Sequence, residues 1–328
     1  MGDNHLGAGP FHRPADLDQP NYWALRREVR GGRLIRMSTG VYVESEYWHS
    51  LSETDKEKAH AVMIARRTGA PLVGRTAALF HRFPLPSSLT DIPVEIGHRR
   101  TGSGTPVIHR HLGPDLTEHL LTIGKGQNAY RLTNPTRTCI DVARWYPMWE
   151  AVTYTDHALR TRMTSVAKLR EHLDQMRGFK GIASARTAVR LATPWSESPR
   201  ESVTKVAMFH AGLPAPLQQV GIYDPRGDLL GRVDFLFEEI SVAVEYDGMG
   251  KHEGEFGVSS LAATKSEFKR HSLLTQEGLL VFRLNAADFT HRDGIDRLVE
   301  QVRRASHHPR PFPQERFRAA GRAWREAP

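Results

Sequence analysis

Two short alternating segments separated by a pair of glutamates constrain this chain more than any other feature. Residues 231–248 read GRVDFLFEEISVAVEYDG. Apolar side chains occupy every second position from Val233 to Phe237 and again from Val242 to Tyr246. This period of two predicts a pair of half-buried antiparallel strands, with the two glutamates in the turn between them.

Three acidic residues fall on these two predicted strands. A turn centred on the two glutamates places Asp234 opposite Ala243, so that Asp234 and Glu245 are diagonal neighbours on one face, with Cβ atoms roughly 7–8 Å apart. Both carboxylates can then reach one divalent cation, and Asp247 continues the same face. Like charges in a half-buried place repel unless a cation or water compensates them. The pattern therefore indicates a metal site, and the alternative is an ordinary solvent-facing side of a hairpin.

The spacing of these acids resembles the core of the PD-(D/E)XK nuclease superfamily. Asp234 is followed after ten residues by Glu245, then by Tyr-Asp-Gly and the basic residue Lys251. The segments SESPRES (196–202) and KSEFKRHSLLTQEGLLVFRLNAADF (265–289) resemble the branch of that superfamily related to very-short-patch-repair endonucleases. This resemblance implies a central mixed sheet flanked by helices and the hydrolysis of phosphodiester bonds in DNA.

The resemblance also implies roles for particular residues. Asp234, Glu245 and the main-chain carbonyl of Tyr246 are expected to hold Mg²⁺, with Mn²⁺ as a substitute. Asp247 stands where the superfamily most often carries lysine, so the residue that neutralises charge on the reacting phosphate is expected elsewhere. The catalytic candidates on this basis are Glu201, Asp234, Glu245, Asp247, Lys251 and Arg270.

Glu201 has a second interpretation that needs no metal. Ser198, Pro199 and Glu201 follow the pattern of a capping box at the start of a helix. In that case the Glu201 side chain reaches back to the amide of Ser198. The two interpretations are compatible, because a glutamate in the first turn of a helix can also point toward the edge of a sheet.

A helix followed by a basic hairpin is predicted near the N-terminus. Asn21 is a suitable cap for a helix over residues 22–30, and LIRMSTGVYV (34–43) has the pattern of two short strands around a turn. This order is typical of a winged helix. RREVRGGRLIRMSTGVYV and NPTRTCIDVAR resemble AbiEi-type antitoxin-like proteins, which implies DNA binding. Over the whole chain, the residues expected to contact DNA are Arg26, Arg27, Arg30, Arg33, Arg36, Lys265 and Lys269. The alternative is a capping hairpin without a DNA contact.

The predicted fold class combines an α+β N-terminal region, a helical connector and a C-terminal α/β domain like that of restriction endonucleases. The N-terminal region is expected to contain the winged-helix-like module and a small sheet. The expected divisions are a flexible N-terminus (1–20), the winged-helix-like module (21–50), an α+β middle domain (51–148), the helical connector (149–196), the nuclease-like domain (197–306) and a basic C-terminal arm (307–328).

Composition restricts the partners and the compartment. The net charge is +8 with an isoelectric point near 9.7, which permits a polyanionic partner. The single cysteine, Cys139, excludes an internal disulfide. No apolar run approaches the roughly 20 residues of a membrane span, and the first residues lack the apolar core of a signal peptide. We therefore expect a cytoplasmic protein without a membrane partner.

The function predicted from the sequence is that of a DNA-binding protein with a magnesium-dependent endonuclease-like domain. The alternative is an AbiEi-type antitoxin-like transcriptional regulator whose nuclease fold is catalytically inert. The absence of lysine at position 247 favours the regulator, and the Asp234 and Glu245 pair favours the enzyme. The oligomeric state stays open, a homodimer included, and a protein partner is expected if the chain belongs to a defence or toxin-antitoxin system.

Overall fold

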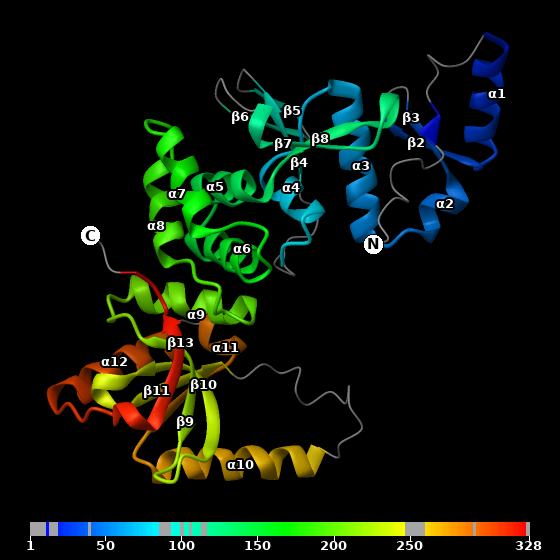
Figure 1. The fold of residues 1–328 in the computed structure, drawn as a ribbon. Helices are drawn as coiled ribbons and strands as arrows, with labels where there is room; N and C mark the ends of the chain where they lie inside the picture. Colours follow the sequence, from blue (N-terminus) through cyan, green and yellow to red (C-terminus); the bar gives the residue numbers. More distant parts are fainter. Residues whose placement is uncertain are drawn as a thin grey trace. The chain divides into compact units, whose positions relative to one another are not determined.

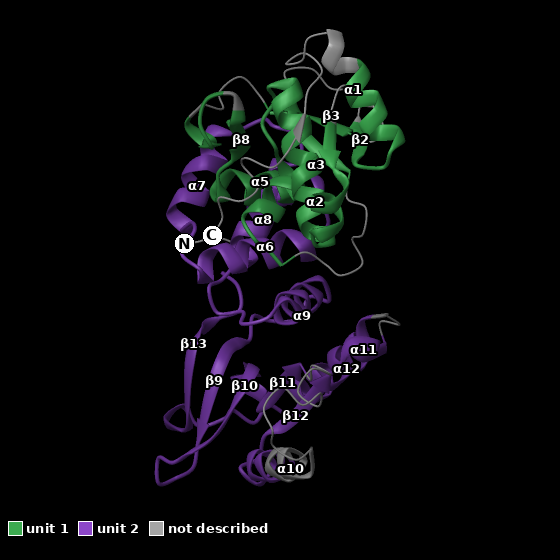
Figure 2. Ribbon diagram, turned by 90° about the vertical axis from the view of Figure 1, so that its right-hand side faces the viewer, with its two compact units in different colours: residues 1–142 green, residues 143–328 purple. Residues whose placement is uncertain are grey.

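The computed structural model describes residues 11–12, 19–38, 41–84, 93–98, 102–104, 107–112, 117–246, 260–290 and 293–325. Over these ranges the chain is α+β (Figure 1). It forms two compact units, residues 1–142 and residues 143–328 (Figure 2). No helix in the described ranges is long and apolar enough to cross a membrane.

The first unit begins with a small sheet beside a helix. Helix α1 (Gln19–Arg30) is followed by the hairpin of β2 (Leu34–Ser38) and β3 (Val41–Glu44), which confirms the predicted order of helix and hairpin. Strand β1 (Phe11–His12) pairs with β3 and completes a sheet with the order β1-β3-β2. The short helix α2 (Ser45–Ser50) follows. Residues 1–20 were expected to form a flexible N-terminus, and within this range β1 and the first two residues of α1 have regular secondary structure.

The rest of the first unit packs two helices against short strands. Its core contains Ala61, Val62, Ile64 and Ala65 from the first of these helices and Val94, Ile96, Tyr130 and Leu132 from the strands. Strands β4 and β6 pair in parallel, and β5 pairs antiparallel with β6. The elements are α3 (Glu53–Thr68), α4 (Gly74–Phe80), β4 (Val94–His98), β5 (Gly102–Gly104), β6 (Val107–His111), β7 (Leu120–Ile123) and β8 (Tyr130–Thr133).

Helices fill the middle of the chain, as predicted. Asn134 begins the first of them, because its side-chain oxygen accepts a hydrogen bond from the Arg137 amide at 2.9 Å. The chain breaks between helices near Arg162, whose φ is 59°, and at Gly178 and Gly181, whose φ values are 84° and 81°. The helices are α5 (Pro135–Trp145), α6 (Met148–Arg160), α7 (Val166–Gln175) and α8 (Ile182–Leu191).

A mixed five-stranded sheet organises the C-terminal part of the second unit. The strand order is β12-β11-β10-β9-β13, and only β11 and β12 run parallel. Strands β10 and β11 are joined by the 3₁₀ turn η4 (Glu238–Ile240) and Ser241, which has a φ of 52°. The strands are β9 (Leu217–Tyr223), β10 (Leu229–Phe237), β11 (Val242–Tyr246), β12 (Leu280–Leu284) and β13 (Phe317–Arg322).

Four helices accompany this sheet. Helix α10 packs against β10 and β12 and lies across the lower end of the strands in Figure 1, whereas α9 packs against β11 and α12. Val220, Val233, Leu236 and Ala243 on the strands meet Leu274 of α10 in one buried cluster. The helices are α9 (Pro199–His210), α10 (Ser260–Gln276), α11 (Ala286–Thr290) and α12 (Asp293–His307).

The two edges of this sheet are β12 and β13, and one expectation for the C-terminal region is wrong. Strand β12 lies at one edge, and its Leu280 is 45% exposed. The residues predicted as a basic arm instead form β13, which pairs with β9 at the opposite edge. Arginines of β13 and of the residue just before it are satisfied within the fold, which allows a basic segment to lie at this edge. Arg316 donates to the carbonyl of Tyr223 at 2.7 Å, and Arg322 donates to the carbonyl of Ala215 at 2.9 Å.

Candidate functional site

The β10–β11 hairpin brings two predicted ligands closer together than the sequence suggested. Phe235 pairs with Val244. One step further along, Asp234 therefore faces Glu245 directly on the neighbouring strand, whereas the predicted register made them diagonal neighbours. The difference is a two-residue shift, and it arises because η4 and Ser241 lengthen the connection beyond the two glutamates.

The neighbouring strands extend this pair into a row across the sheet. The residues that flank Asp234 pair with the residues that flank Gln219 of β9, so Asp234 and Gln219 lie side by side. On the other side, Glu245 pairs with Arg283 of β12. Gln219, Asp234, Glu245 and Arg283 thus occupy one line across four adjacent strands. No sequence pattern indicated that Gln219 or Arg283 belonged to this row.

Glu245 is buried between arginines. The residue is 7% exposed, and a buried carboxylate charge requires a compensating partner. Arg270 of α10 supplies two hydrogen bonds, from Nη1 to Oε1 at 2.5 Å and from Nη2 to Oε2 at 3.2 Å. Arg283 adds an ion pair, with 3.4 Å between its Nε and Oε2. Arg270 also donates from Nη1 to the Arg232 carbonyl at 3.1 Å, which ties α10 to β10.

Asp234 fixes the end of the neighbouring strand. Its Oδ2 accepts a hydrogen bond from the Tyr246 amide at 2.8 Å. The Tyr246 ring lies against Phe289 of α11, with 6.0 Å between the ring centroids. The carboxylate and the carbonyl-bearing residue predicted to share a metal are therefore adjacent, and their relative position is held by a charge-assisted hydrogen bond.

Glu201 joins the start of α9 to the same sheet. Its Oε2 accepts from the Glu197 amide at 2.9 Å and from Gln219 Nε2 at 2.7 Å. Ser198 caps the helix, accepting from the Glu201 amide at 3.2 Å. The capping function of Glu201 is present, but it is directed at Glu197 rather than at Ser198. The side chain at the same time reaches the row through Gln219.

Gln219 has an unusual backbone for a strand residue. Its φ of 52° lies in the left-handed region, which L side chains rarely adopt. The residue is 8% exposed, and within the described part of the chain its Oε1 has no hydrogen-bond partner. Strained backbones of this kind persist where the surrounding structure fixes them, and they concentrate at functional sites.

The remaining candidates divide into those inside and those outside the described ranges. Asp247 and Lys251 lie outside the described residues, so their predicted roles stay predictions. Lys269 is exposed on α10. Lys265 is on the same helix, and its side chain is not among those described. Within the described residues, no three His, Cys, Asp or Glu side chains gather at a common point.

The predicted DNA-contacting residues of the first unit are not equivalent. Arg26, Arg27 and Arg30 are exposed on α1. Arg33, in contrast, forms a two-contact ion pair with Glu28, one contact being from Nη2 to Oε1 at 2.7 Å. This hydrogen bond holds the pKa of Glu28 below its usual value. Arg33 is thus already paired within the chain.

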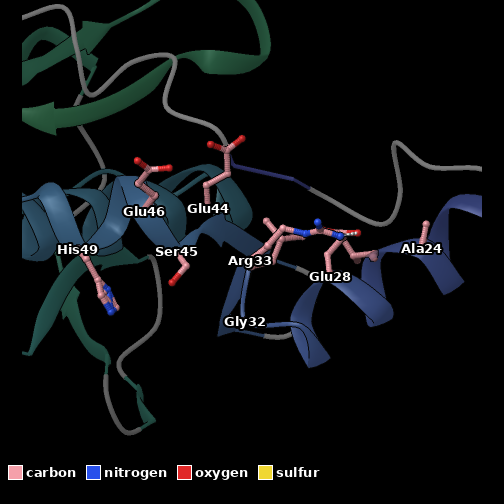
Figure 3. A pocket seen from close by; sticks show the side chains of 10 residues that line it. Ala24, Glu28, Gly32, Arg33, Glu44, Ser45, Glu46 and His49 are labelled. Atoms are coloured by element: carbon pink, nitrogen blue, oxygen red, sulfur yellow. Dashed lines mark hydrogen bonds and ion pairs between the residues drawn. The ribbon is translucent and has the colours of Figure 1, made fainter.

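A hollow of about 700 Å³ lies beside α1 (Figure 3), and no sequence pattern predicted it. Its lining comes from α1, from the β2–β3 hairpin and from α2, and includes Ala24, Leu25, Arg33 and Ser45. Glu28 is neutralised by Arg33, but Glu44 and Glu46 leave the lining with an excess of acidic groups, which disfavours the phosphates of a DNA backbone. The acidic lining residues are Glu28, Glu44 and Glu46.

A buried ion pair fixes α9, which carries Glu201, to the helices of the second unit. Lys205 Nζ lies 2.7 Å from Asp156 Oδ2 of α6, and both side chains are fully buried. Burial lowers the pKa of Lys205, and Asp156 acts in the opposite direction. The same Asp156 carboxylate accepts from Ser196 at 2.6 Å and from Ser202 at 2.7 Å. Because the two charges satisfy each other, we interpret this network as structural: it positions α9 against α6. No sequence motif indicated it.

Comparisons with known proteins identify relatives but no family. No model of a known protein family matches the chain. Proteins from two strains of Mycobacterium tuberculosis, CDC 1551 / Oshkosh and ATCC 25618 / H37Rv, are each 27% identical to this chain over 230 residues. The alignments cover 69% of this chain and 78% of each relative. Both relatives are described as uncharacterized proteins, so the similarity carries no activity with it.

Proposed function

We propose that the chain is a DNA-binding protein whose second unit contains a PD-(D/E)XK-type nuclease domain. In this proposal the domain hydrolyses phosphodiester bonds with Mg²⁺ or Mn²⁺. The observation that carries it is the placement of Asp234 directly opposite Glu245 on adjacent strands of a mixed sheet. Gln219 lies beside Asp234 on the neighbouring strand, and it donates a hydrogen bond of 2.7 Å to Glu201.

The donor atoms fit a hard divalent cation. Asp234, Glu245 and the Tyr246 carbonyl offer oxygen atoms only, the type of ligand that Mg²⁺ prefers. In the structure, both oxygens of Glu245 are engaged by Arg270. A cation must therefore replace the Arg270 contact before Glu245 can act as a ligand. A bound cation would polarise the phosphate and lower the pKa of a water molecule.

The residues of the chain have distinct roles in this proposal. Asp234 and Glu245 would bind the cation, and Glu201 and Asp247 would orient the water molecules around it. Arg270, released from Glu245, remains anchored to β10 by the Arg232 carbonyl and presents its charge to the phosphate. Lys251 is the other candidate for that role. A cytoplasmic location belongs to the proposal, because a single cysteine is typical of a reducing compartment.

A second function is favoured by the arginine contacts themselves. Arg270 and Arg283 neutralise Glu245 within the fold, as expected of a site that has lost its metal. The chain would then be an AbiEi-type antitoxin-like transcriptional regulator with an inert nuclease fold. Its DNA contacts would come from a winged-helix module made of α1 and the β2–β3 hairpin.

Cleavage and metal binding together distinguish the two functions. Purified protein is incubated with supercoiled and linear DNA in Mg²⁺, Mn²⁺ or EDTA, and calorimetry measures metal binding. For the enzyme we expect metal-dependent cleavage that Glu245→Gln abolishes, since the substitution keeps the shape but removes a ligand charge. Loss of an outer-shell partner typically lowers metal affinity by about 10- to 100-fold, and Glu245→Gln, which removes a direct ligand, should lower it by more.

Glu239→Gln is the matched control, because Glu239 is exposed in the turn of the same hairpin. It should leave cleavage and metal binding unchanged. If the wild type cleaves no DNA with either metal, and Glu245→Gln changes no metal binding, the nuclease proposal is wrong. Sequence-specific binding of duplex DNA without cleavage would then support the regulator.

A further inference from the structure

One face of α1 combines an aromatic ring with three positive charges. Trp23, Arg26, Arg27 and Arg30 are spaced i, i+3, i+4 and i+7, the spacing that puts side chains on one side of a helix. All four are exposed, and Trp23 is 69% exposed. We name these four residues the Trp–Arg stripe.

The stripe is not the face by which α1 attaches to the rest of its unit. Leu25 is buried, and Ala24, Leu25 and Glu28 line the hollow shared with the β2–β3 hairpin and α2 (Figure 3). At about 100° per residue, Leu25 and Glu28 lie on the other side of the helix from Trp23 and Arg30. The hydrogen bond from Arg33 is the main cause of the lowered pKa of Glu28, and the neighbouring charge of Arg27 adds to it, so the stripe borders the acidic lining of the hollow at Arg27.

The stripe has the chemistry of a surface for single-stranded nucleic acid. The guanidinium carbon of Arg26 lies 5.7 Å from the centroid of the Trp23 ring, a cation–π distance. An exposed indole offers a flat π surface on which a base can stack, and the arginines beside it can contact the phosphates on either side of that base. Aromatic rings set in a basic surface are the usual means of binding unpaired strands without sequence preference.

We propose that the Trp–Arg stripe binds unpaired nucleotides of DNA, with Trp23 stacking on a base and Arg26, Arg27 and Arg30 binding phosphates. This inference rests on the proposed function for the identity of the partner as DNA. It adds that the preferred substrate contains a single-stranded segment. Arg33 has no part in the stripe, because Glu28 holds its guanidinium.

Fluorescence anisotropy with the full-length protein tests the inference. The probes are a fluorescein-labelled single-stranded 20-mer and a blunt duplex of the same sequence. Trp23→Ala should weaken binding to the single strand by about 5- to 150-fold, the range for alanine substitution of a base-stacking aromatic residue. Binding to the duplex should be unchanged, because paired bases offer no free face. Trp23→Phe should retain most of the affinity for the single strand.

Two further variants complete the design. Trp149→Ala removes another surface tryptophan, 36% exposed on α6, and should bind both probes like the wild type. Arg30→Ala should reduce the salt dependence of single-strand binding by about 0.7 in the slope of log K against log salt. Circular dichroism checks that each variant is folded.

The results distinguish this inference from the proposed function. If Trp23→Ala binds the single strand as tightly as the wild type, or if it weakens binding to both probes equally, the stripe is not a stacking surface. Cleavage that depends on Glu245 would still support the nuclease proposal in either case. Conversely, a stacking contribution from Trp23 together with a protein that never cleaves DNA would support the inference and reject the nuclease.

Discussion

Burial lowers the pKa of individual histidines in both units. The pKa values of His60, His81 and His157 all lie below their ordinary value, and desolvation is the main cause for each. His81 follows α4, and its Nε2 lies 2.7 Å from the Thr133 carbonyl. That hydrogen bond raises its pKa, but burial has the larger effect. A neutral ring that donates to the carbonyl is the form that this site favours.

The lowered pKa of His81 makes the first unit sensitive to acid. In the unfolded chain His81 titrates near 6.5, whereas in the folded chain it gains its proton only at lower pH. Below about pH 6.5 the unfolded state binds more protons, so the free energy of unfolding should fall as the pH decreases toward the folded pKa. His81→Gln keeps a donor near Thr133 and removes the titration. Its urea midpoint should fall less steeply between pH 7.5 and pH 5.5 than that of the wild type.

His111→Gln provides the comparison, because His111 is exposed at the end of β6. This variant should follow the wild-type pH dependence. Identical slopes for the wild type, His81→Gln and His111→Gln would contradict the assignment.

Single residues also show where sequence reasoning about the site stops. The acids at 234 and 245 were predicted from their alternation with apolar residues, and the structure places them side by side. The contact of Arg270 with Glu245 joins α10 to β11, and no local pattern specifies which charge on a helix meets which strand position. The strained backbone at Gln219 could not be predicted for the same reason, because tertiary contacts hold it.

At the scale of elements, β13 pairs with β9 and passes close to a tryptophan at Gly321. A Cβ atom on Gly321 would lie 2.5 Å from Nε1 of Trp195, far closer than atoms can pack. Trp324, just after the strand, packs edge-on against Phe209 of α9, with 5.7 Å between the ring centroids. Glycine at position 321 is therefore required for β13 to lie against Trp195 at this edge of the sheet.

A double-mutant cycle tests the docking of β13. Gly321→Ala should lower the free energy of unfolding by about 1–3 kcal/mol, the usual range for overpacking. Adding Trp195→Ala removes the ring that the new methyl group meets, so the double variant should lose less than the sum of the single variants. Urea unfolding of all four proteins measures the coupling. Strictly additive effects would show that β13 does not lie against Trp195.

The ends of helices and strands were predictable where capping side chains mark them. They were not predictable where only tertiary contacts determine them. Ser198 with Pro199 marks the start of α9, and Asn134 with Pro135 marks the start of α5. The end of α6 carries no such mark, because Arg162 rather than glycine adopts the left-handed conformation there. The hairpin register was missed because two glutamates resemble a two-residue turn, whereas η4 is a 3₁₀ turn.

At the scale of the whole molecule, the positive charge of the chain is less available than its sequence suggests. The net charge is +8, but many arginines near the C-terminus bind the protein itself. Arg316 pairs with Glu277 at 2.6 Å, and Arg325 donates to the Val189 carbonyl at 3.0 Å. Arg318 donates to the Phe317 carbonyl at 2.8 Å and lies over the Tyr223 ring. The stripe on α1 is a clearer place for phosphate contacts.

The salt dependence of duplex binding measures this difference. Replacing Arg26, Arg27 and Arg30 together by alanine should reduce the slope of log K against log salt by about 2 to 3, since each lost phosphate contact contributes about 0.9. Arg318→Ala should leave the slope unchanged, because its guanidinium is engaged within the fold. A slope that falls with Arg318→Ala and not with the triple variant would place the phosphates on the C-terminal residues instead.

The order of strands in the five-stranded sheet has a consequence for how the second unit assembles. Strands β9, β10 and β11 follow one another in sequence and pair as neighbours, so their contacts close short loops. Strand β12 can pair with β11 only after the connection through α10 has closed. Strand β13 pairs with β9, which lies far from it in the sequence. Closing such long loops slows folding, because the entropy is lost before the contacts form. A sheet of β9, β10 and β11 alone would expose both of its edges to other chains, and unpaired strand edges favour aggregation until β12 and β13 join.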